Sequence, residues 1–118
     1  SSDLMKSHIS VILIVFILII AGCAGITYPE VSRLSEVSHA PLPGNAPILL
    51  STKDIDQKYD EIAIINIRSA SWTKIDELNE ALRQRARELG ANAVVRIQYG
   101  HEGMWGNPTA TGVAVRIK

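Results

Sequence analysis

The sequence contains very little cysteine and no excess of either charge. One cysteine among 118 residues excludes an internal disulfide framework and any zinc or iron–sulfur site built from several cysteines. Twelve basic and twelve acidic side chains give a formal net charge of zero. That balance argues against a nucleic-acid-binding surface that depends on bulk positive potential. The length allows one small domain and a tail.

The longest apolar run lies near the amino terminus, from Val11 to Ile20. At about 1.5 Å per residue, a helix over this run is too short to cross a hydrocarbon core about 30 Å thick. Lys6 precedes the run and small residues follow it, which is typical of a secretory signal peptide. We therefore interpret residues 1–22 as a signal peptide and expect Met5 to be its natural start. An uncleaved membrane helix or a buried apolar segment is the alternative.

The run ends in Ile20, Ala21, Gly22 and Cys23. This order of one aliphatic residue, two small residues and a cysteine resembles the lipobox of bacterial lipoproteins. The resemblance implies cleavage before Cys23 and lipidation of its thiol, so that the mature chain has no free thiol. Each buried methylene contributes about 0.8 kcal/mol, so two or three acyl chains such as palmitate form an effectively permanent anchor. Because Ala24 rather than Asp follows the cysteine, the resemblance favours the outer over the inner membrane if the bacterium is Gram-negative.

The next stretch, residues 23–47, is rich in proline and serine. Pro29, Pro41, Pro43 and Pro47 fall within it. Because proline lacks a backbone donor and has a fixed φ, this composition argues against a helix or a central strand. We expect a flexible tether whose root-mean-square span is about 25–30 Å, which would hold the domain near the membrane but clear of it.

Residues 48–118 carry the periodic patterns of a folded domain. Residues 61–68 predict a strand covered on both faces. An apolar stripe from Ile75 to Leu89 predicts a helix that Thr73 caps and Gly90 ends. Alternating residues predict two further strands, at 93–99 and 111–117, joined by a glycine-rich loop. Residues 48–50 are a candidate short strand that ties the tether to the domain. The predicted class is α+β: a small βαββ domain in which one helix packs on a sheet.

The helix end and the following strand carry one recognisable pattern. Residues 86–95, with the sequence Ala-Arg-Glu-Leu-Gly-Ala-Asn-Ala-Val-Val, and residues 111–115 resemble the YbjQ-type family, which is named for heavy-metal binding. The same helix end occurs in the RcsF stress sensors, a group of small envelope lipoproteins. The resemblance implies a small α+β domain, ring-like oligomers and a metal or small-ligand function. RcsF-like proteins depend on several domain cysteines, and residues 48–118 contain none.

Few side chains of the mature chain point to chemistry. His101 and Glu102 are weak candidate metal ligands, because adjacent side chains on an extended chain diverge and a stable site needs three or four ligands. Met104 and Trp105, in the glycine-rich loop, are candidates for an apolar contact with a partner or with lipid headgroups. The alternative is that Trp105 folds back over the sheet edge. We expect Trp72 to be a core or staple residue.

No spacing of nucleophiles, bases or acids predicts catalysis, so we expect no enzyme activity and no cofactor. The first hypothesis is a membrane-anchored, non-enzymatic interaction or sensing module of the bacterial cell envelope, with an envelope protein as a possible partner. The second is a small-ligand or heavy-metal-binding module of the YbjQ type. The third is a structural homo-oligomer, because about 65 folded residues make a marginal core. We expect no nucleic-acid partner.

Overall fold

The structure is a computed structural model that describes residues 6, 8–10 and 25–118. The predicted signal cleavage motif, residues 20–22, and the predicted lipidation site, Cys23, lie outside these described residues. Within them, no helix is both long enough and apolar enough to cross a membrane.

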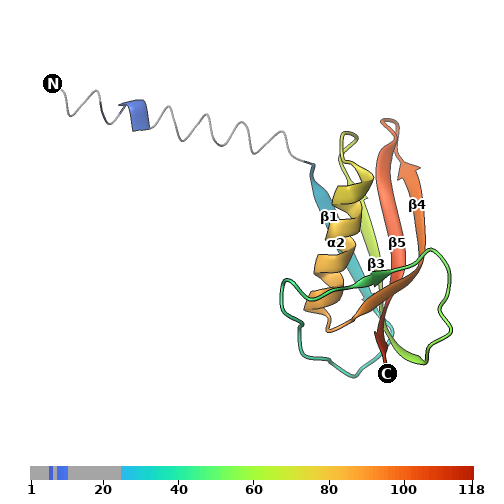
Figure 1. Cartoon of the computed structure of the whole chain (residues 1–118). Coiled ribbons are helices and arrows are strands. Elements are labelled where there is room, and N and C mark those ends of the chain that lie inside the picture. The colour runs from blue at the N-terminus through green and yellow to red at the C-terminus, as the bar shows by residue number, and fades with distance from the viewer. Residues whose placement is uncertain (1–5, 7, 11–24) are drawn as a thin grey trace.

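Residues 25–118 form one five-stranded sheet with a helix packed on one face (Figure 1). The elements are β1 (Thr27–Arg33), β2 (Leu49–Leu50), β3 (Tyr59–Ser69), α2 (Ile75–Glu88), β4 (Ala93–Glu102) and β5 (Asn107–Ile117). The strand order is β1-β3-β5-β4-β2; every neighbouring pair is antiparallel except β4 and β2, which are parallel. The predicted α+β class with one helix on a sheet is confirmed, and the sheet has two more strands than the predicted βαββ unit.

Helix α2 forms where the apolar stripe predicted it. Leu78, Leu82 and Ala86 are fully buried against the sheet. The helix ends in a Schellman motif: the N–H of Ala91 donates to the carbonyl of Ala86, and the N–H of Gly90 donates to that of Arg87. Gly90 adopts a φ of 76°, as the predicted left-handed helix end requires.

The first turn of α2 differs from the prediction. The residue preceding the helix is Lys74, and no side chain caps it. Thr73 is buried, and its hydroxyl donates to the carbonyl of Ile26 instead of to the helix. Ile75, placed in the apolar stripe from its spacing, is the first residue of the helix and is exposed.

The predicted tether is not a free tether. Its first part forms β1, which pairs along its whole length with β3. Pro29 is compatible with this strand because β1 is at the sheet edge, where a missing donor is tolerated. The later part crosses the carboxyl end of α2: the N–H of Leu42 donates to the carbonyl of Arg87 at 2.8 Å, and Arg87 Nε donates to the carbonyl of Ala46 at 2.9 Å. The predicted boundary at residue 48 therefore divides a continuous folded unit.

The sheet has two unequal apolar faces. The larger cluster lies beneath α2 and includes Ile65 and Ile67 of β3. The smaller lies on the opposite face around Ala93, Val95 and Val115, covered by the β2–β3 connection. The alternation predicted for residues 93–99 is broken by a bulge between Val95 and Gln98, so that Ile97 joins the larger cluster.

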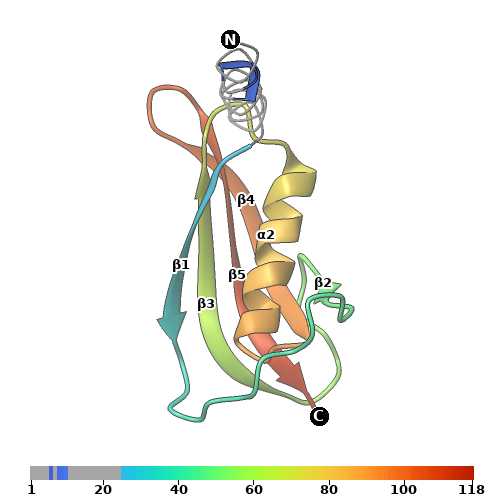
Figure 2. The same ribbon diagram turned by 90° about the vertical axis from the view of Figure 1, so that its left-hand side faces the viewer.

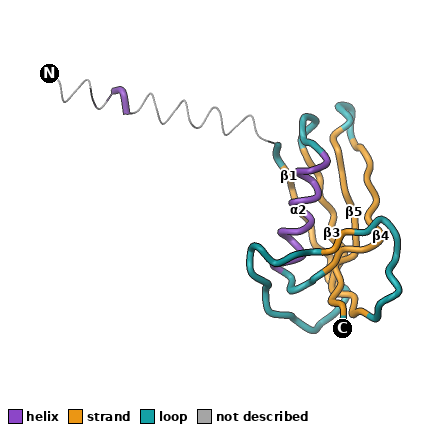
Figure 3. The backbone as a smooth tube through the Cα atoms, viewed as in Figure 1, coloured by secondary structure: helices purple, strands orange, loops and turns teal. Residues whose placement is uncertain are grey.

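Three segments far apart in the sequence meet at one end of the sheet. They are the start of β1, the connection from β3 to α2, and the turn between β4 and β5, and both views place them together (Figures 1 and 2). The carboxyl terminus lies at the other end, where the long connections flanking β2 also run (Figure 3). The described chain therefore enters the domain beside the β4–β5 turn.

Candidate functional site

The end of the sheet at which β1 begins carries a group of exposed apolar side chains, which we call the aromatic end. Its members are Tyr28, Trp72, Met104 and Trp105. Met104 is 92% exposed and Trp105 79%, the two highest values among the large apolar residues of the described chain. Trp72 and Tyr28 are 56% and 55% exposed. Exposed apolar side chains gathered in one place indicate a contact surface, whereas scattered ones do not.

A shallow cleft of about 410 Å³ lies within the aromatic end. It is lined by Tyr28, Ser69, Ala70, Ser71, Trp72, Trp105 and Asn107. Three aromatic rings from three separate segments therefore border one open depression. This arrangement can bind an apolar or amphipathic group through non-covalent contacts.

The backbone holds these segments in place. Ser69, at the end of β3, is buried, and its hydroxyl donates to the carbonyl of Pro108 on β5 at 2.6 Å. The carbonyl of Ile26 accepts hydrogen bonds from the N–H of Ala70 at 3.1 Å and from the Thr73 hydroxyl at 3.3 Å. The start of β1 is thus tied to the connection that carries Trp72.

The β4–β5 turn that carries Met104 and Trp105 is shorter than predicted. β4 extends to Glu102 and β5 begins at Asn107. Gly103 and Gly106 both have positive φ, at 74° and 65°, a conformation that glycine adopts without strain. The turn therefore holds its two apolar side chains outward. The alternative in which Trp105 folds over the sheet edge is wrong.

Sequence reasoning missed half of the aromatic end. Trp72 was expected to be a core or staple residue and is instead more than half exposed at the cleft. Tyr28 lay in the predicted tether, and only the pairing of β1 with β3 brings it to the cleft. No local signal could have placed Tyr28 there, because the pairing joins residues about forty positions apart.

Charged groups near the aromatic end are mostly acidic. Arg68 pairs with Glu30 at 3.2 Å and with Glu102 at 3.9 Å. The first turn of α2 carries Asp76 and Glu77. These groups leave no basic patch, so the surface has no electrostatic preference for an anionic partner.

The predicted candidate metal ligands do not form a cluster. Glu102 points toward Arg68, and because successive strand residues face opposite sides, His101 projects away from it. Within residues 25–118 and the few described before them, no group of three or more His, Cys, Asp or Glu side chains can hold a metal ion.

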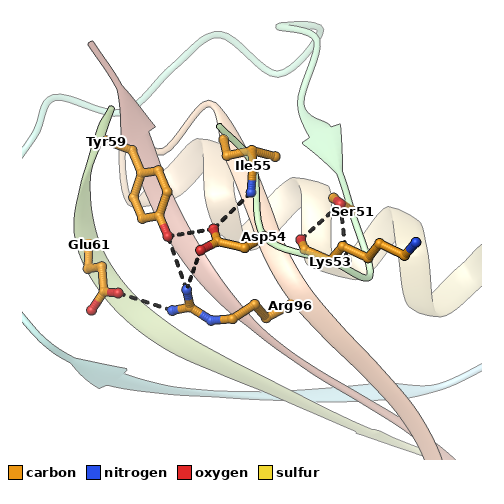
Figure 4. Close-up of polar contacts among 7 residues, drawn as sticks. All are labelled: Ser51, Lys53, Asp54, Ile55, Tyr59, Glu61 and Arg96. Carbon is orange, nitrogen blue, oxygen red and sulfur yellow. Dashed lines mark hydrogen bonds and ion pairs between the residues drawn. The ribbon is translucent and has the colours of Figure 1, made fainter. Parts of the chain in front are cut away.

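A polar cluster that the sequence did not indicate lies on the face of the sheet opposite α2 (Figure 4). The Tyr59 hydroxyl donates to Asp54 Oδ1 at 2.7 Å, and the N–H of Ile55 donates to the same atom at 2.8 Å. Arg96 donates to the Tyr59 hydroxyl and to Glu61, each at 3.0 Å. The bond from Tyr59, then that from Ile55, lowers the pKa of Asp54, whereas the bond to Asp54 raises the pKa of Tyr59.

This cluster fastens the β2–β3 connection over the smaller apolar cluster. Arg96 sits in the β4 bulge with a φ of 53°, an uncommon conformation that bulky residues adopt only when their surroundings enforce it. The backbone N–H of Arg96 donates to the backbone carbonyl of Lys53 at 3.2 Å. Every charged member is paired with another, so the cluster is a structural latch.

No protein-family model matches the chain, and no curated protein matches it. Among solved structures, the chain is similar to a Francisella virulence factor, FvfA, in its orthorhombic crystal form, with a TM-score of 0.55 and 12% identity. The similarity covers 75% of this chain and 97% of that one. At this identity it shows a shared small α+β fold. The YbjQ-type resemblance at residues 86–95 is not accompanied by a family match.

Proposed function

We propose that the chain is a lipid-anchored lipoprotein of the bacterial envelope and acts as a non-enzymatic interaction module. Cys23 is the anchor, and the aromatic end is the contact surface. The observation that carries the proposal is the gathering of Tyr28, Trp72 and Trp105, all more than half exposed, around one open cleft, with the exposed Met104 next to Trp105 in the turn.

The sequence supports the proposed lipid anchor at Cys23, and the fold supports the proposed interaction module. The lipobox-like order of residues 20–23 comes directly before the folded chain begins. The fold is shared with a bacterial virulence factor. The RcsF-like helix end occurs in envelope lipoproteins, which agrees with the same location. The outer membrane is the favoured site in a Gram-negative bacterium, because Ala24 follows the cysteine.

A second candidate function is the binding of a small ligand, as the YbjQ-type resemblance implies. The cleft of about 410 Å³ is the observation that favours it, because ligand pockets are commonly about 300–1,000 Å³. The cleft is open and shallow, and its polar lining consists of Ser69, Ser71 and Asn107. A contact with an extended surface agrees better with this shape.

Site-specific photo-crosslinking in a bacterium that processes lipoproteins tests the proposal. A photoreactive phenylalanine replaces Trp105 in one variant and Leu49 in a matched control, since Leu49 is also exposed but lies at the opposite end of β4. We expect covalent adducts with envelope components from position 105 and none above background from position 49. Equal adduct formation at the two positions would contradict a specific contact surface.

A further inference from the structure

We infer that the aromatic end lies in the headgroup region of the bilayer that holds the anchor, so that the membrane itself is the partner of this surface. The inference rests on the proposed lipidation of Cys23. One partner, the lipid bilayer, would then contact the exposed side chains of all three segments: the β4–β5 turn, the β3–α2 connection and β1.

The distance available between anchor and domain is the first argument. Ile26 is fixed to the domain, because its carbonyl accepts bonds from Ala70 and Thr73. Only three peptide units separate Ile26 from Cys23, and a fully extended chain spans at most about 3.3–3.6 Å per residue. The Cα atom of Ile26 therefore lies within about 11 Å of that of Cys23. The acyl chains of Cys23 hold its backbone at the headgroup level.

This gap leaves little room for a protein partner between the domain and the bilayer. A single helix with its side chains is about 10–12 Å across, so it would fill the whole space between the bilayer and the start of β1. The headgroup layer is about 5–7 Å thick on each side of a bilayer. The start of β1, with the segments that meet it in Figures 1 and 2, therefore reaches or nearly reaches the headgroups.

The chemistry of the aromatic end is the second argument. Trp and Tyr favour the membrane–water interface, because each combines an apolar ring with a polar atom that stays hydrated. Trp105 and Met104 stand at the tip of the turn, and Tyr28 and Trp72 stand beside the entry of the chain. A single apolar contact with lipid covers all four.

The local charges determine which lipids this contact prefers. Arg68 is paired with Glu30 and Glu102, while Lys74 stands beside Asp76 and Glu77 at the start of α2. Because the acidic groups outnumber these two basic ones, the contact depends on apolar insertion and not on attraction to anionic headgroups. We expect a stronger contact with zwitterionic than with anionic bilayers, because the excess acidic charge is repelled by anionic headgroups.

Quenching of tryptophan fluorescence by brominated lipid tests the inference on the lipidated chain. The chain is reconstituted into phosphatidylcholine vesicles brominated on acyl carbons near the headgroup. A Trp72→Phe variant leaves Trp105 as its tryptophan, since the sequence contains two. A control carries Trp72→Phe, Trp105→Phe and Lys58→Trp, because Lys58 is exposed and lies beside the carboxyl terminus at the far end of β3.

We expect Trp105 to lose most of its emission in brominated vesicles and to shift toward the blue in unbrominated ones, while the reporter at position 58 keeps its emission. Unchanged Trp105 emission in protein that floats with the vesicles would overturn the inference and leave the aromatic end to a protein partner. Failure of the chain to float with vesicles, together with an unmodified Cys23 by mass, would refute the proposed anchor instead. The two failures are therefore distinguishable.

Discussion

Replacement of Gly90 by alanine tests whether residues 39–46 are packed on the end of α2 or form part of a free tether. Gly90 has a φ of 76°, which costs alanine about 1–2 kcal/mol. A Cβ atom at this position would also lie 2.5 Å from His39 Cβ and 2.6 Å from the carbonyl oxygen of Ala40. Relief of that contact must displace the backbone that leads to the bond from Leu42 to Arg87, which contributes about 0.5–1.5 kcal/mol.

Gly90→Ala should therefore lower the free energy of unfolding by about 1.5–3.5 kcal/mol, the sum of the two contributions. Gly103→Ala is the matched control, because Gly103 has a φ of 74° but nothing within 4 Å of its Cβ position. It should cost only the conformational part, about 1–2 kcal/mol. Urea unfolding of the purified chain in mild detergent, followed by circular dichroism, measures both losses. The dependence of the unfolding free energy on urea concentration should have the same slope in both variants, so that a shift in midpoint reports stability alone. Equal losses for the two variants would refute the packing of residues 39–46 on the helix end.

Three further predictions concern the hydrogen bonds and packing that hold the domain together. Thr73→Val should cost about 1 kcal/mol by removing the bond to the start of β1, and Thr52→Val, at an exposed site, should cost nearly nothing in the same urea experiment. Leu82→Ala should cost about 2–5 kcal/mol, because Leu82 of α2 is fully buried against the sheet, and a loss below 1 kcal/mol would contradict that packing. Asp54 has a lowered pKa when folded, so its contribution is present above the unfolded pKa, about 3.8, and is lost as the pH falls through the lower folded pKa. Urea midpoints below pH 5 should fall more steeply for the wild type than for Asp54→Asn, and parallel curves would show that the bond from Tyr59 is not formed in solution.

Local patterns in the sequence were enough to predict the helix and the main strands. The spacing of Leu78, Leu82 and Ala86 and the position of Gly90 depend only on neighbours within a few turns. The strands at 93–99 and 111–117 likewise follow from alternation. These elements are confirmed, although β4 and β5 extend further toward their shared turn than the glycine content suggested.

What the sequence could not supply were the contacts between distant segments. The proline and serine between residues 23 and 47 argued against a strand there, so β1 was not predicted. Proline is excluded from central strands but is tolerated in an edge strand, and β1 lies at the edge. The bulge at Arg96, held by partners on β3 and on the β2–β3 connection, redirected the side chains that follow it. The aromatic end was half predicted, from Met104 and Trp105. Its other half, Tyr28 and Trp72, required the sheet order.

The corrected length of the tether alters the relation between domain and membrane. A free chain over residues 23–47 would hold the domain about 25–30 Å from its anchor. Pairing of β1 with β3 leaves only Ala24 and Gly25 between the anchor and the fixed Ile26. With the proposed lipid anchor at Cys23, the domain would sit on the bilayer instead of at a distance from it, and the exposed aromatic residues would meet the membrane.

The intact mass of the protein extracted from membranes tests the central claim, lipidation of Cys23, most directly. The account predicts a mature species that begins at Cys23 and carries added acyl mass, and a Cys23→Ala variant that lacks both the cleavage and the added mass. A chain from membranes that retains residues 5–22 and has an unmodified Cys23 would contradict the account. It would make the apolar run a membrane or buried segment and Cys23 a free thiol.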